Sequence, residues 1–136
     1  MTSRPLDIQV RDSVFDPAIP PLPRPKVYVR KSGNNTLYKV WLYLSGYDLP
    51  YVQSATYILH PTFSDPIRVV RRNLNNPDCQ LIIWTWGTFE IKVKIEDKSG
   101  RYYEVVHRLN YDKELKQDFE YIYEEEVQRT MQRSQF

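Results

Sequence analysis

Residues 89–96 read Phe-Glu-Ile-Lys-Val-Lys-Ile-Glu, and they carry the clearest strand pattern in the chain. Apolar and charged side chains alternate without a break, which is the period-two pattern of a half-buried β-strand. The turn signal Lys98-Ser99-Gly100 follows, and residues 101–109 then return as a second alternating run. Two such runs joined by a short glycine-containing turn predict an antiparallel β-hairpin.

More strands are expected upstream of this hairpin. The patterns predict them at residues 26–31, 37–45, 52–59, 67–70 and 80–84. Short strands in succession, with no helical pattern between them, favour two packed antiparallel sheets. We therefore predict an all-β chain whose central domain, residues 27–112, is an immunoglobulin-like β-sandwich. The single cysteine, Cys79, excludes the disulfide-bonded form of that fold.

The N-terminal 26 residues are rich in proline, which fixes φ, removes a backbone donor and disfavours helices and central strands. We predict that residues 1–26 form an extended, proline-rich arm. Its motif Pro20-Pro21-Leu22-Pro23 is either part of a stiff arm along the sandwich or a ligand for an aromatic groove. The stiff arm is the favoured interpretation.

The C-terminal segment carries a helical pattern of apolar residues. Apolar residues recur at the spacing of one helix face, namely Leu115, Phe119, Ile122, Tyr123 and Val127. We predict an amphipathic α-helix over residues 113–136. Two roles are open for it: packing on the sandwich, or pairing with a second copy in a homodimer.

Composition excludes several classes of function. The chain has 136 residues with 19 basic and 17 acidic side chains, and a net charge of +2 argues against a nucleic-acid binder. Its apolar runs are far shorter than the ~20 residues of a membrane-spanning helix. A lone cysteine and no secretion signal favour the cytoplasm, or the nucleus in a eukaryote.

Catalytic and metal sites are not expected. The chain has two histidines and one cysteine, which leaves little for metal binding, and we predict no cofactor. The sequence contains no Ser-His-Asp order and no glycine-rich phosphate loop. The protein is therefore predicted not to be an enzyme.

Two short segments resemble a known family. Residues 59–63 read Leu-His-Pro-Thr-Phe, and residues 84–91 read Trp-Thr-Trp-Gly-Thr-Phe-Glu-Ile. They resemble the L-H-x-[ST]-F and G-W-G-x-F segments of the YEATS domain in order and spacing, and the resemblance covers residues 37–112. Thr85 replaces the first glycine, and the loop at residues 46–52 is short. These departures make the chain most similar to the prokaryotic YEATS-like branch.

The resemblance implies a ligand-binding site formed by His60, Thr62, Phe63, Thr85, Trp86 and Gly87. Acylation removes the charge of a lysine and leaves a flat amide. Phe63 and Trp86 are the expected pair of aromatic faces for that group. Thr62 offers a hydroxyl, which a hydrogen bond from His60 can hold in place. The backbone N–H of Trp86 can bind a carbonyl, and Gly87 leaves room for backbone approach.

Two functions follow from this site. The favoured one is a non-catalytic module that recognises an acetylated or crotonylated lysine, or a similar planar acyl group, between Phe63 and Trp86. Its partner would be an acylated protein or peptide. The alternative is a YEATS-like sensor or protein-interaction domain of a prokaryotic signalling or defence system. Its ligand would differ or be absent, and its partner would be another protein.

Overall fold

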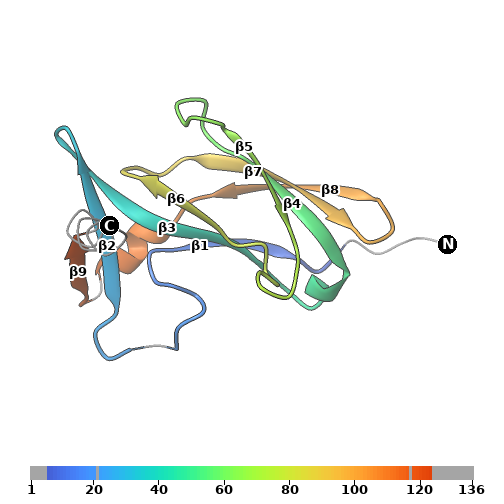
Figure 1. The fold of residues 1–136 in the computed structure, drawn as a ribbon, viewed down its shortest axis with the longest axis horizontal. Coiled ribbons are helices and arrows are strands. Elements are labelled where there is room, and N and C mark those ends of the chain that lie inside the picture. The colour runs from blue at the N-terminus through green and yellow to red at the C-terminus, as the bar shows by residue number, and fades with distance from the viewer. Residues whose placement is uncertain (1–5, 21, 117, 124–136) are drawn as a thin grey trace, which may run out of the picture. The chain divides into compact units, whose positions relative to one another are not determined.

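The computed structural model describes residues 6–20, 22–116 and 118–123 (Figure 1). The chain divides into two compact units. The first unit comprises Met1–Asp12, Leu42–Leu81 and Phe89–Leu109, and the second unit comprises Ser13–Trp41, Ile82–Thr88 and Asn110–Phe136. The two units are described separately.

The first unit contains a four-stranded antiparallel sheet in the order β5-β4-β7-β8. Its strands are β4 (Val52–Ile58), β5 (Ile67–Arg71), β7 (Glu90–Asp97) and β8 (Tyr102–Arg108). In β7, Ile91, Val93 and Ile95 are buried, while the charged residues between them face outward. The alternation in residues 89–96 therefore predicted both the strand and its buried face.

The turn between β7 and β8 is closed by Asp97. Its Oδ1 accepts hydrogen bonds from the backbone N–H groups of Ser99 and Arg101, at 2.9 and 3.0 Å, and from the Ser99 hydroxyl at 2.6 Å. These donors favour the charged carboxylate, so they lower the pKa of Asp97, with the Ser99 hydroxyl contributing most. Asp97 thus stabilises the hairpin turn in its ionised form.

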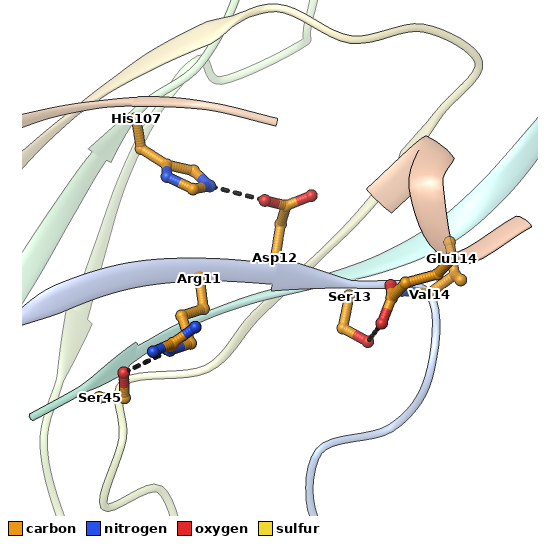
Figure 2. Close-up of polar contacts among 7 residues, drawn as sticks. All are labelled: Arg11, Asp12, Ser13, Val14, Ser45, His107 and Glu114. Carbon is orange, nitrogen blue, oxygen red and sulfur yellow. Dashed lines mark hydrogen bonds and ion pairs between the residues drawn. The ribbon is translucent and has the colours of Figure 1, made fainter. Parts of the chain in front are cut away.

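The proline-rich arm predicted over residues 1–26 is wrong over residues 9–13. Gln9–Ser13 form strand β1, which pairs with β3 (Asn35–Ser45). Arg11 Nε donates to the Ser45 hydroxyl at 2.7 Å, and Asp12 Oδ1 lies 2.6 Å from His107 Nε2 (Figure 2). No proline lies between Pro5 and Pro17, so this stretch keeps the backbone donors that a paired strand needs.

The second unit is built around β2 (Lys26–Ser32), which pairs antiparallel with β3 in the register Val29↔Tyr38. Strand β6 (Leu81–Thr85) also pairs with β3. The core of this unit includes the buried side chains of Val27, Val29 and Val40. The strands of both units thus bury β-branched residues, which favour strands.

The C-terminal helix predicted over residues 113–136 is also wrong where the structure describes it. Tyr111–Lys116 form a short 3₁₀ helix, and Glu120–Tyr123 form strand β9, parallel to β2 with Val27 opposite Tyr121. Pairing with β2 satisfies the backbone of this segment and overrides its helical spacing. Residues 124–136, which include the rest of the predicted stripe, lie outside the described residues.

The other predicted strands are present, each within two residues of its predicted ends. The all-β fold class is confirmed, with 3₁₀ turns at Leu49–Tyr51 and Tyr111–Lys116 as the described helical segments. The immunoglobulin-like stacking of the two sheets stays a prediction.

Among the described residues, no helix combines the length and apolar character needed to span a membrane.

Candidate functional site

The first group of predicted site residues lies in the loop that follows β4, in the first unit. The base of this loop is closed by a 2.8 Å hydrogen bond from Leu59 N–H to the Pro66 carbonyl. Within it, Phe63 N–H donates to the His60 carbonyl at 3.0 Å. Arg68 donates to the carbonyls of Asp65 and Ser64, at 2.6 and 3.0 Å. The backbone that carries His60, Thr62 and Phe63 is therefore fixed by the chain around it.

His60 and Thr62 are hydrogen-bonded to each other, as predicted. His60 Nδ1 lies 2.8 Å from Thr62 Oγ1 and also accepts the Thr62 N–H at 3.3 Å. A nitrogen that accepts an N–H carries no proton, so the Thr62 hydroxyl is the donor in the shorter bond. The hydroxyl proton is therefore engaged in the hydrogen bond to His60. The lone pairs of Thr62 Oγ1 remain available to accept a hydrogen bond from a ligand.

The ring of Phe63 is half-buried and packs against Phe89. The two ring centroids are 5.6 Å apart, and the His60 ring meets Phe89 edge-on at 5.8 Å. Phe89 directly precedes β7, and its carbonyl accepts a 3.1 Å hydrogen bond from Leu109 N–H. Phe89 is half-buried and contacts both His60 and Phe63.

The second group of predicted site residues lies at the end of β6, in the second unit. Thr85 is buried, and its Oγ1 accepts the Gly87 N–H at 3.4 Å and lies 3.3 Å from the Gly87 carbonyl oxygen. The buried Tyr111 hydroxyl donates to the same carbonyl at 2.9 Å. Thr85 and Tyr111 therefore hold the turn from beneath, which the sequence indicated for neither residue.

Trp86 sits at the centre of this turn with 65% of its side chain exposed. Its neighbour Trp84 is different, because the guanidinium of Arg30 lies 4.3 Å from the Trp84 ring centroid. A Cβ added to Gly87 would meet no atom within 4 Å, so the space beside Trp86 is open. The turn therefore presents one free indole face on a fixed backbone.

The six predicted residues thus form two local clusters, one in each unit. His60, Thr62 and Phe63 make up the first cluster, and Thr85, Trp86 and Gly87 make up the second. The predicted pairing of Phe63 with Trp86 around one ligand stays a prediction.

A family model described as the prokaryotic YEATS domain matches residues 37–110, more than half of the chain. The chain belongs to the prokaryotic YEATS domain family. Both clusters fall inside the matched residues. Strands β1, β2 and β9 fall outside them.

Two relatives are similar to this YEATS domain. Transcription initiation factor TFIID subunit 14 of Schizosaccharomyces pombe is 36% identical over 69 residues, which are 49% of this chain and 27% of that protein. The chain therefore spans about a quarter of that curated relative. The crystal structure of the yeast AF-9 homolog protein Yaf9 matches with a TM-score of 0.51 and 16% identity, over 76% of this chain and 68% of that one. At this identity, the likeness to Yaf9 shows the fold alone.

Cys79 and Tyr57 are buried in the first unit of the YEATS domain. Cys79 is buried, and burial raises the pKa of its thiol to about 11, so the thiol is protonated at neutral pH. The Tyr57 hydroxyl donates to the Cys79 carbonyl at 2.6 Å, and burial raises the pKa of Tyr57 well above its ordinary value. Across the described ranges, no group of three His, Cys, Asp or Glu residues could hold a metal ion.

Proposed function

We propose that this YEATS domain is a non-catalytic binding module that recognises an acylated lysine, such as acetyl- or crotonyl-lysine, between Phe63 and Trp86. The observation that carries the proposal is the exposed indole of Trp86 on a turn fixed by Thr85 and Tyr111. A flat acyl group can stack on this exposed indole.

The polar groups of the two clusters suit the two halves of an amide. The Thr62 hydroxyl donates its hydrogen bond to His60 Nδ1, which leaves the lone pairs of Thr62 Oγ1 free. Oγ1 can therefore accept a hydrogen bond from the N–H of the acylated side chain. The backbone N–H of Trp86 is assigned to the acyl carbonyl. Unmodified lysine would bring a charge that must be desolvated between two aromatic rings, which disfavours it.

The other residues of the two clusters, together with Phe89, position the groups that contact the ligand. His60 orients Thr62, and Phe89 supports the Phe63 ring from below. Thr85 is buried, so its role is to hold the turn and not to touch the ligand. Gly87 leaves the approach to Trp86 open.

The affinity should be modest. An aromatic contact contributes about 0.5–1.5 kcal/mol beyond the area it buries. Each neutral hydrogen bond adds about 1 kcal/mol net. Together with the burial of a short acyl chain, these terms correspond to a Kd that is roughly micromolar or weaker.

Tryptophan fluorescence during titration with acetyl-, crotonyl- and unmodified lysine peptides tests the proposal. Trp86 is exposed and will respond, whereas Trp41 is buried and Trp84 is covered by Arg30. We expect a saturable change with the acylated peptides alone. Calorimetry should show that Trp86→Ala abolishes binding and that Trp84→Phe retains it. Normal binding by Trp86→Ala would exclude the proposed site.

A second candidate, the protein-interaction domain, is favoured by one separate observation. The outward face of the first unit's sheet exposes Ile67 and Val69 on the edge strand β5. Exposed apolar residues on a sheet face are typical of protein contacts when they gather in a patch. An interaction of this kind would be independent of acylation, would survive Trp86→Ala, and would be weakened in Val69→Asp. Pull-down with these two variants separates the candidates.

A further inference from the structure

A cavity of about 430 Å³ lies in the second unit, apart from both loop clusters. Its walls come mainly from the loop between β1 and β2, drawn in blue in Figure 1, and from Tyr28 on β2. Aromatic, aliphatic and proline side chains dominate the lining, among them Phe15, Pro17, Ile19, Leu22, Pro23 and Tyr28. The size and lining are those of a site for a small molecule.

The walls of this cavity are held apart by the chain itself. Pro17, Pro20, Pro23 and Pro25 all line it, and their fixed φ angles restrict the loop. Hydrogen bonds anchor the start of the loop: the Ser13 hydroxyl donates to Glu114 at 2.9 Å (Figure 2), and Phe15 N–H donates to Ser13 Oγ at 3.0 Å. At the other end, Glu120 N–H donates to the Pro25 carbonyl at 2.8 Å. The cavity is therefore preformed and open to an occupant.

Three charged side chains line the cavity: Asp16, Asp118 and Lys26, and of these Lys26 and Asp118 are exposed. Asp16 is half-buried in the wall, and its Oδ1 accepts the Ala18 N–H at 2.9 Å. Within the described part of the chain, no cationic side chain pairs with Asp16. The second carboxylate, Asp118, lies 3.6 Å from Arg24 Nε in an exposed ion pair, which is of little energetic weight. A half-buried carboxylate beside an apolar cavity favours a bound cation, because a charge-assisted hydrogen bond offsets its desolvation.

We propose that this cavity binds a small molecule with an apolar, ring-sized body and one protonated amine. The body lies among Phe15, Tyr28 and the proline rings, and the amine donates to Asp16. All residues that line the cavity precede or follow residues 37–110. The site is therefore separate from the matched domain and independent of the acyl-lysine proposal.

Amide NMR spectra of the full chain test this site with a matched pair of probes. Phenethylamine and 3-phenylpropionate share the ring and differ in the sign of their charge. We expect phenethylamine to shift the signals of Phe15, Ile19 and Tyr28 saturably in the millimolar range. The anionic probe, 3-phenylpropionate, should bind at least tenfold more weakly than phenethylamine. Equal binding of the two probes, or no saturable shift with phenethylamine, would overturn the proposal.

Two variants assign the amine contact to Asp16. Asp16→Asn keeps an oxygen that can accept the Ala18 N–H, so the loop is retained while the charge is lost. This variant should weaken the binding of phenethylamine about tenfold. It should also remove the preference for phenethylamine over 3-phenylpropionate. The control Asp118→Asn should weaken the binding of phenethylamine much less, because the Asp118 side chain is 83% exposed. If Asp16→Asn binds both probes as the unaltered chain does, the amine does not bind at Asp16.

Discussion

The two loops that carry the proposed site are held in opposite ways. The His60–Phe63 loop is held at the surface, by an exposed His60–Thr62 hydrogen bond and a ring contact with half-buried Phe89. The Thr85–Gly87 turn is held from beneath, by the buried side chains of Thr85 and Tyr111. Buried polar contacts are costly to break, whereas exposed ones contribute little to stability. Changes in the first loop should therefore alter binding, and changes beneath the second should alter the fold.

The largest effect is expected beneath the second loop. Tyr111→Ala removes a buried aromatic side chain and should lower the free energy of unfolding by about 3–5 kcal/mol. Tyr111→Phe keeps the ring and loses the hydrogen bond to Gly87, which should cost about 1–2 kcal/mol. Urea unfolding followed by circular dichroism measures both values. An equal loss in the two variants would show that the hydroxyl, and not the ring, anchors this region.

A smaller loss of stability, with a larger loss of binding, is expected at Phe89. Phe89→Ala removes the support of His60 and Phe63 from a half-buried position, and should cost about 2 kcal/mol. Acylated peptide should then bind at least tenfold more weakly, because the Phe63 ring is no longer held. Phe89→Tyr keeps the ring and serves as the control. Retained affinity in Phe89→Ala would separate the first loop from ligand binding.

Thr62 should separate binding from stability most clearly. Thr62→Val removes an exposed hydroxyl and should change the free energy of unfolding by less than about 1 kcal/mol. The variant also loses the acceptor for the ligand amide. The affinity for acylated peptide should therefore fall about tenfold, or ~1.4 kcal/mol. Calorimetry of Thr62→Ser should give nearly unaltered affinity. A Thr62→Val variant that binds normally would remove Thr62 from the site.

The smallest effect at neutral pH comes from Asp97, at the far end of β7 from Phe89. Its pKa is lowered in the folded chain, so the stabilisation is present above its ordinary pKa and is lost as pH falls through the folded value. Acid titration should therefore show a loss of stability below about pH 4 that is smaller in Asp97→Asn. Identical acid profiles would show that Asp97 does not carry this dependence.

The contrast between the loops also explains what the sequence could predict. Strand β7 was readable because Ile91, Val93 and Ile95 alternate with charges, and the two loop clusters were readable from short motifs. The roles of Phe89 and Tyr111 could not be predicted, because they depend on contacts with residues far along the chain. The Tyr111 hydroxyl meets Gly87, 24 residues away, and no local pattern indicates that pairing.

The terminal segments were misread for a related reason. Residues 120–123 become a strand because β2 offers a parallel partner, and nothing in their own spacing shows it. The strand at residues 9–13 was hidden by the prolines on either side, although Ile8 and Val10 are both buried. Local pattern predicts elements that bury one face, but it does not predict elements whose identity depends on a distant partner.

In the proposed function, two separately held loops bind one acylated lysine. Amide NMR during titration with a crotonyl-lysine peptide tests it most directly. We expect the signals of His60–Phe63 and of Thr85–Gly87 to shift together, with one Kd. Unmodified peptide should shift neither group. Shifts confined to one loop, or different Kd values for the two, would contradict it.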